Sequence, residues 1–125
     1  MAVHLTGQVK VTALAWILDY AANVHEIVAK HGGNHLSRSG NIETYERDKL
    51  DATIIALVEF PDRASLDPFV SSLEYAPLAV ARTAGSESHL RVIDDAGLAG
   101  GIPYRPAGKL VRHVRQLVHQ AGAKI

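Results

Sequence analysis

The stretch TIIALVEF, Thr53 to Phe60, decides the fold because it is apolar on both of its sides. The even-numbered residues from Ile54 to Phe60 are all apolar, and Ile55 and Leu57 are apolar on the opposite side. Successive side chains of a β-strand point to opposite faces, so a strand of this kind must be covered on both faces. One small chain has helices enough for only one face. We therefore predict a strand whose second face is covered most simply by another copy of the protein.

The segments on either side of this stretch supply three further strands. Residues 3–11, VHLTGQVKV, alternate between apolar and polar side chains, which is typical of a strand with one face in a core. Residues 34–39, NHLSRS, are predicted to begin a second strand, and residues 42–47 to continue it or pair with it. Residues 88–94, SHLRVID, are predicted to form the fourth.

A helix is predicted between the first two strands. Thr12 can cap it, and Gly32 and Gly33 end it because glycine readily adopts the positive φ that is often needed just past a helix. Its apolar residues recur at helical spacing. They are Leu14, Ile17, Leu18, Ala21, Val24, Ile27 and Val28.

A second helical region follows the third strand. Asp62 is a candidate cap, and Pro68 inside the region implies either a kink or a restart with Asp67 as the cap. The resulting order, β-α-β-β-α-β, predicts an α+β fold of the ferredoxin-like, split βαβ kind. In that fold a four-stranded antiparallel sheet carries both main helices on one face.

The C-terminal residues differ from the rest of the chain. Residues 96–108 form a Gly/Pro-rich linker, and residues 109–120, KLVRHVRQLVHQ, place apolar residues along one stripe of a predicted C-terminal helix. All 13 acidic residues lie in residues 1–95, whereas residues 96–125 hold five basic residues and no acid. We divide the chain into a ferredoxin-like domain, residues 1–95, and this basic extension, which is expected to pair with acidic surface within or between subunits.

The composition excludes several classes of function. The 125 residues contain no cysteine, which excludes disulfides, thiol nucleophiles and thiolate metal sites. The apolar run VTALAWIL ends before Asp19 and is far shorter than the roughly 20 residues of a membrane span. The strands carry no pair of stacking aromatics of the kind an RNA-binding sheet uses. We predict a cytoplasmic protein without membrane or nucleic-acid partners.

The stretch KHGGNHLSRSG, Lys30 to Gly40, admits three interpretations: a metal site, a phosphate loop, or the end of a helix followed by a strand. It lacks the lysine-serine or lysine-threonine ending and the preceding strand of a phosphate loop. His31 and His35 share no helical face, because two glycines separate them, and no third ligand follows at a recognisable spacing. We predict no metal and no cofactor, and retain Arg38 as a pocket candidate.

Several of these residues together resemble a known family. The marks are Tyr20, the pair Gly32-Gly33, Arg38, the triplet Glu59-Phe60-Pro61 and the run from Ser72 to Tyr75. In this order and spacing, residues 3–95 resemble the domain-of-unknown-function family numbered 1330, in the dimeric α+β barrel group that includes small monooxygenases and muconolactone isomerases. The resemblance implies a homodimer whose two sheets pack face to face, and it implies no particular reaction. The chain departs from the family pattern at Trp16, Ile17, Pro68 and Leu73.

The first strand contributes three candidate ligand-binding residues. If its odd-numbered residues face the helices, then His4, Thr6 and Gln8 point toward the interior of the barrel. Polar groups in an enclosed space must be hydrogen-bonded to one another, to water or to a ligand. An interior pocket is therefore predicted on this face.

Arg38 and Glu59, on the second and third strands, are the candidate catalytic residues, and both are expected to reach one sheet face. They form either a structural ion pair, or a site in which Arg38 holds a carboxylate or carbonyl oxygen. Glu59 or a nearby histidine would then move a proton. Tyr75 is a further ligand-binding candidate through its hydroxyl, with packing as the alternative role.

Two functional hypotheses follow from the predicted pocket. The first is a cofactor-independent enzyme of isomerase or monooxygenase type that acts on a small organic acid, cyclic ketone or lactone, an inference from fold analogy and polar interior residues. The second is a non-catalytic ligand-binding or stress-associated homodimer. The sequence names neither a substrate nor a reaction.

Overall fold

A computed structural model describes residues 1–97 and Ile102, and Met1–Asp94 form one compact unit within it. The order of its elements is β-α-β-β-α-α-β. The strands are β1 (Val3–Val11), β2 (Asn34–Ser39), β3 (Ile54–Phe60) and β4 (Ser86–Asp94), and the helices are α1 (Ile17–Lys30), α2 (Arg63–Val70) and α3 (Ala76–Ala84). Most of the expected linker, and the whole C-terminal helix expected over residues 109–120, lie outside the described residues.

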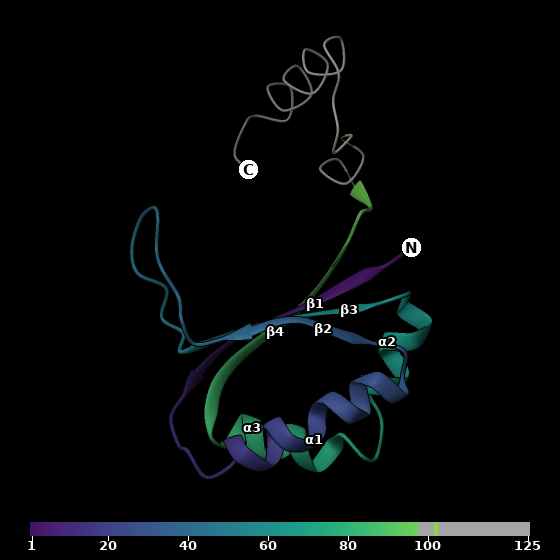
Figure 1. Ribbon diagram of the computed structural model, residues 1–125, viewed down its shortest axis with the longest axis horizontal. Helices are drawn as coiled ribbons and strands as arrows, with labels where there is room; N and C mark the ends of the chain where they lie inside the picture. The colour runs from purple at the N-terminus through teal and green to yellow at the C-terminus, as the bar shows by residue number, and fades with distance from the viewer. Residues whose placement is uncertain (98–101, 103–125) are drawn as a thin grey trace. The chain divides into compact units, whose positions relative to one another are not determined.

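The four strands form one antiparallel sheet in the order β2-β3-β1-β4. The three helices lie together on one face of this sheet, and no helix of the described part covers the other face (Figure 1). This arrangement confirms the predicted ferredoxin-like α+β fold, with the second helical region divided into two helices.

The core lies between the sheet and the helices. Val3 of β1 and Phe60 of β3 are almost fully buried there, so the predicted alternation of β1 is confirmed. A Cβ on Gly33 would come within 2.6 Å of Phe60 Cε1 and 2.7 Å of Val28 Cγ1, so only glycine lets the turn after α1 pack this closely on the core. The core residues are Val3, Val24, Ile27, Val28, Val58, Phe60, Leu66, Phe69, Tyr75 and Leu78.

Helix α1 begins later than the apolar pattern predicts. Its N-cap position is Trp16, without a side-chain capping bond, so the expected cap at Thr12 is wrong. The backbone N–H of Thr12 instead donates to the carbonyl of Gly85. Leu14 and Leu18 are exposed, because the core side of the helix starts at its second turn. None of the described helices is long and apolar enough to cross a bilayer, and α1, the longest of them, has 14 residues.

The second helical region divides after Val70 and not at Pro68. The side chain of Asp62 accepts a hydrogen bond of 2.8 Å from the backbone N–H of Ser65, which confirms the predicted cap. Helix α2 continues through Pro68, so the expected restart with Asp67 as the cap is wrong. Burial of the neighbouring Phe69 offsets the one backbone hydrogen bond that proline cannot make.

The connection from β2 to β3 contains no strand, so the expected strand over residues 42–47 is wrong. The sequence of residues 42–47, IETYER, is mostly polar, and most of these side chains are exposed. Arg47 has a φ of 63°, which is incompatible with an extended strand.

Candidate functional site

The helix-covered face of the sheet carries a cavity. The strand register places Gly7 opposite both Ala56 and Leu90, and places Ala56 opposite Arg38. Directly opposite residues of antiparallel strands share a face, so these four residues form one row across the sheet. A cavity of about 280 Å³ lies over this row, and Tyr20 is among the helix residues that line it.

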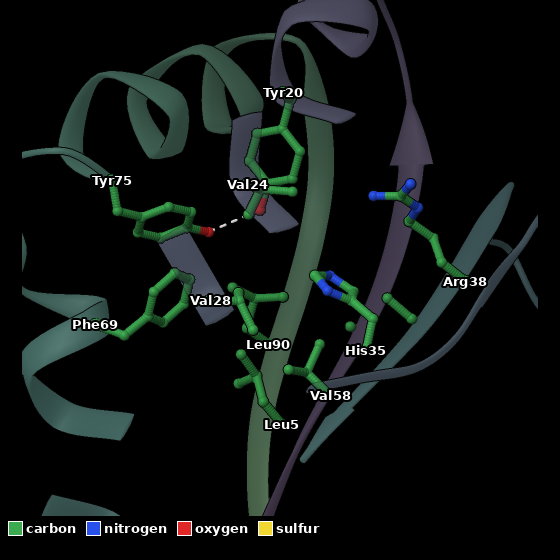
Figure 2. Close-up of a pocket in the computed structure, with 12 residues that line it drawn as sticks. Leu5, Tyr20, Val24, Val28, His35, Arg38, Val58, Phe69, Tyr75 and Leu90 are labelled. Atoms are coloured by element: carbon green, nitrogen blue, oxygen red, sulfur yellow. Dashed lines mark hydrogen bonds between the residues drawn. The ribbon is translucent and has the colours of Figure 1, made fainter. Parts of the chain in front are cut away.

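A smaller cavity of about 60 Å³ adjoins the first and shares the same row and Tyr20. It adds His35 of β2 and Tyr75, the residue before α3, to the lining. Figure 2 shows His35 and Arg38 projecting from β2 into this space, with the two tyrosine rings on the helix side. The two cavities together form one candidate site between the sheet and the helices.

A β-bulge in β2 puts His35 and Arg38 on the same face. His35 pairs with Val58 and Ser37 pairs with Leu57, so Leu36 is an extra residue in β2. In a regular strand, positions three apart point to opposite faces. Because the bulge adds one residue between them, His35 and Arg38 point to the same face, and both side chains line the cavity.

The hydroxyl groups of Tyr20 and Tyr75 lie 2.7 Å apart and form a hydrogen bond (Figure 2). Burial raises the pKa of Tyr20 well above its usual value, the neighbouring Tyr75 adds to the rise, and the charge of Arg82 opposes it. The Tyr20 phenol therefore stays protonated at neutral pH. Because one O–H donates to the other oxygen, the second O–H remains able to donate to a bound molecule.

Arg82 of α3 is the most unusual residue of the larger cavity. Its exposed fraction is only 7%, and its Nε has no hydrogen-bond partner. It takes part in none of the ion pairs found among the described residues. The guanidinium interacts with the Tyr20 hydroxyl, which does not neutralise its charge. A buried charge without a counter-ion is costly, and an anion that entered the cavity would offset this cost.

The cavity is electropositive and mainly apolar. Arg38 and Arg82 line it, and no aspartate or glutamate of residues 1–97 does. Arg38 is exposed and borders the cavity at the edge strand β2. No cluster of three or more histidine, aspartate or glutamate side chains suited to a metal occurs in the described part of the chain.

Trp16 forms one wall of the larger cavity. Its Nε1–H donates to the carbonyl oxygen of Gly85 at 2.9 Å, and its ring packs edge-on against Tyr20 with a centroid separation of 5.3 Å. A Cβ on residue 85 would overlap the Trp16 ring, so glycine is required there. The wall is therefore fixed by a contact between the start of α1 and the end of α3.

His35 is held neutral by its surroundings. Burial lowers the pKa of His35 below its ordinary value of 6.5, the positive charge of Arg38 lowers it further, and electrostatic interaction with the neighbouring His25 adds to the fall. The ring of His25 stacks on the ring of His35, with a distance of 6.3 Å between the ring centroids. A neutral imidazole in the cavity can accept a proton.

The lowered pKa of His35 predicts a loss of stability in mild acid. The unfolded chain binds a proton at His35 near pH 6.5, before the folded chain does, so the free energy of unfolding falls as the pH drops through 6.5 toward the folded pKa. We expect His35→Leu to flatten this fall. Urea unfolding at about pH 7.5 and about pH 5.5 measures it. An unchanged fall in His35→Leu would contradict the assignment.

The candidates predicted from the sequence divide between the two faces of the sheet. Arg38 and Tyr75 line the cavity on the helix side. Glu59 lies opposite His4 and contacts its Nε2 at 3.2 Å on the open face. The expectation that Arg38 and Glu59 reach one face is therefore wrong, because the register pairs Arg38 with Ala56.

The open face carries the remaining candidates. Thr6 and Gln8 lie on it with His4, as the alternation of β1 predicts, and the Thr6 hydroxyl donates to the carbonyl of Arg91 at 3.4 Å. Neither Thr6 nor Gln8 lines the cavity on the helix side. Their proposed role in ligand binding therefore depends on a partner that closes this face.

Sequence reasoning missed three residues of the cavity. Arg82 lies in an irregular stretch without a clear pattern, and no motif singles it out. Tyr20 was named only as a mark of the family and Trp16 only as a departure from its pattern, and neither was assigned to a pocket.

Comparison with known proteins supports the fold. The family described as Domain of unknown function (DUF1330) matches residues 2–96. A crystal structure of SnoaB, a cofactor-independent oxygenase from Streptomyces nogalater, is 19% identical with a TM-score of 0.55, covering 74% of this chain and 91% of that one. No curated protein matches the chain.

Two further crystal structures share the fold. A protein of unknown function from Rhodopseudomonas palustris is 14% identical with a TM-score of 0.61, covering 84% of each chain. A dimeric ferredoxin-like protein of unknown function from Jannaschia sp. CCS1 is 11% identical with a TM-score of 0.54, covering 75% of this chain and 99% of that one. At these identities the similarity shows the fold alone.

Proposed function

The chain belongs to the family described as Domain of unknown function (DUF1330), and on that premise we propose that it binds a small, mainly apolar organic acid between its sheet and its helices. The observation that carries this proposal is Arg82, a buried guanidinium whose Nε has no partner. An anionic oxygen in the cavity that Arg82 lines would neutralise this charge.

The rest of the cavity fits the same class of ligand. Its lining is mostly apolar, with a few polar groups that converge on one space, as is typical of small-molecule sites. Arg38 supplies a second guanidinium, and the hydroxyl pair of Tyr20 and Tyr75 supplies a donor. The volume of about 280 Å³ suits a molecule smaller than most drugs.

A panel of small acids tests the proposal. We expect benzoate, cyclohexanecarboxylate and butanoate to raise the midpoint of thermal unfolding, since a ligand that binds only the folded state stabilises it. The matching uncharged amides are expected to raise it much less. Arg38→Ala should reduce the response to the acids, and Arg91→Ala, on the open face, should not. No response to any acid, or an equal response in Arg38→Ala, would contradict the proposal.

Proton transfer to and from a bound cyclic ketone is the second candidate function. The favouring observation is the neutral His35, which shares one face with Arg38 and adjoins the tyrosine hydroxyls. His35 would take a proton from the carbon beside the carbonyl, and a hydroxyl or guanidinium would stabilise the enolate oxygen; return of the proton to the same carbon gives exchange, and in a ketone with a neighbouring carbon-carbon double bond its return to the far carbon of the dienolate would give an isomer. SnoaB, of similar fold, is described as a cofactor-independent oxygenase.

Exchange of hydrogen for solvent deuterium tests this second candidate. NMR of cyclohexanone in heavy water should show exchange beside the carbonyl that is accelerated by the protein, and His35→Gln should slow it by about a hundredfold, the usual contribution of a general base. If the His35→Gln variant exchanges hydrogen for deuterium at the wild-type rate, His35 is not the general base. The proton-transfer function would then be wrong, and ligand binding would remain as the proposed function.

The open face of the sheet is proposed to pack against that of a second copy. Ile55 and Leu57 of β3 and Ile93 of β4 give this face an apolar centre, and Ile93 is 58% exposed in the single chain. The Jannaschia protein of the same fold is described as dimeric. In such a homodimer the pair of His4 and Glu59 would lie at the interface, where its polar groups need partners.

A further inference from the structure

Resting on the proposed acid-binding function, we infer that the cavity selects flat cyclic acids, because Gly7 and Ala56, the two smallest residues of the row, form a low floor beside the Leu90 side chain on which a planar ring can lie. The floor is part of the row that crosses all four strands. In this row two large side chains, Leu90 and Arg38, stand on either side of the two smallest. The row is therefore a shallow trough in the sheet, closed at its two ends.

Gly7 is not required by the backbone. It lies in the middle of β1, is paired on both sides, and has no positive φ. Glycine weakens a strand, because it loses more conformational freedom on folding and offers no side chain for packing. A Cβ there would meet only Leu90 Cδ2 at 3.1 Å and Ala56 Cβ at 3.8 Å. The end of the Leu90 side chain already lies beside Gly7, and a glycine inside a strand also lets a ligand approach the backbone closely.

The opposite side of the space is aromatic. Trp16 and Tyr20 line the larger cavity from the start of α1. A space with a flat backbone floor and an aromatic wall accommodates a planar ring better than a puckered one, because ring faces stack at van der Waals distance. Arg82, with its unpartnered Nε, lines the same cavity and supplies the binding partner for the carboxylate.

Calorimetric titration with three acids tests the shape of the floor. Benzoate has a flat ring, cyclohexanecarboxylate has a puckered ring of similar size, and butanoate has no ring. We expect benzoate to bind at least about tenfold more tightly than cyclohexanecarboxylate, since overpacking a close-fitting site costs at least one decade in affinity. Equal affinity for the two ring acids would overturn the inference.

Substitution of the floor provides the second measurement. Gly7→Ala is expected to fold, because the added methyl group displaces only the flexible end of Leu90, and to weaken benzoate about tenfold while changing butanoate less than about twofold. Ala56→Val, which adds bulk from the neighbouring strand, should act in the same way. Ala22→Val, at an exposed position of α1, is the control. Benzoate affinity unchanged in both floor variants would overturn the inference.

The outcomes separate this inference from the proposed function. If benzoate, cyclohexanecarboxylate and butanoate all fail to bind the wild-type protein, the acid-binding function itself is wrong. If they bind with similar affinity and the floor variants bind like the wild type, the acid-binding function stands and the selection for flat rings is wrong.

Discussion

Arg82→Met is expected to make the protein more stable and to weaken its affinity for small acids. The buried guanidinium has no counter-ion among the described residues, so the folded state bears the cost of its desolvation. Methionine has a similar length and no charge, and it should raise the free energy of unfolding by about 1 kcal/mol or more. The same change removes a charge-assisted hydrogen bond to the ligand, worth about 1.5–3 kcal/mol, and should weaken acid binding by about tenfold to a hundredfold.

Two measurements on the same variant check these opposite effects. Urea unfolding without ligand gives the change in stability, and calorimetric titration with benzoate gives the change in affinity. Arg63→Met is the matched control, because Arg63 is exposed and pairs with Asp67 at 3.5 Å. If Arg82 has a purely structural role, the reverse result is expected. The Arg82→Met variant would then be strongly destabilised, and the ligand affinity of its folded fraction would be unchanged.

Leu57→Lys is expected to separate the proposed dimer into folded monomers. Leu57 lies on the open face between Thr6 of β1 and Ser37 of β2, so a charge there would be buried only when a second sheet covers it. An unpaired charge buried in an interface costs several kcal/mol, which is comparable with the affinity of many dimers. In the single chain the same side chain reaches solvent, so the fold is expected to persist.

Sedimentation velocity at micromolar concentration measures this effect. The wild type should sediment at twice the chain mass of 13.5 kDa, and Leu57→Lys at the mass of one chain. Val80→Lys, at an exposed position of α3, introduces the same charge on the helical side and should leave the dimer intact. A wild type that sediments as one well-folded chain would contradict the dimer.

The fold could be predicted because its signals are local. The alternation of β1 and the double-sided β3 depend on residues adjacent in sequence, and so does the cap at Asp62. The departures occur where a tertiary contact outweighs the local rule. Helix α2 continues through Pro68 because the buried Phe69 holds its last turn in the core.

The site could be predicted only in part, because it depends on which face each side chain reaches. Tyr75 and Arg38 were identified, but the partner assigned to Arg38 lies on the other face. The bulge at Leu36 changes the face of the sheet that the later side chains of β2 reach, and nothing in the sequence NHLSRS indicates this bulge. The burial of Arg82 depends on how α3 packs on the sheet and on α1, which no short pattern encodes.

A crystal structure of the protein with bound benzoate tests most directly whether the helix-covered cavity is the binding site. The carboxylate is expected within hydrogen-bond distance of Arg82, with the ring between Tyr20 and the floor formed by Gly7 and Ala56. Benzoate bound instead on the open face, beside His4 and Gln8, would contradict this assignment.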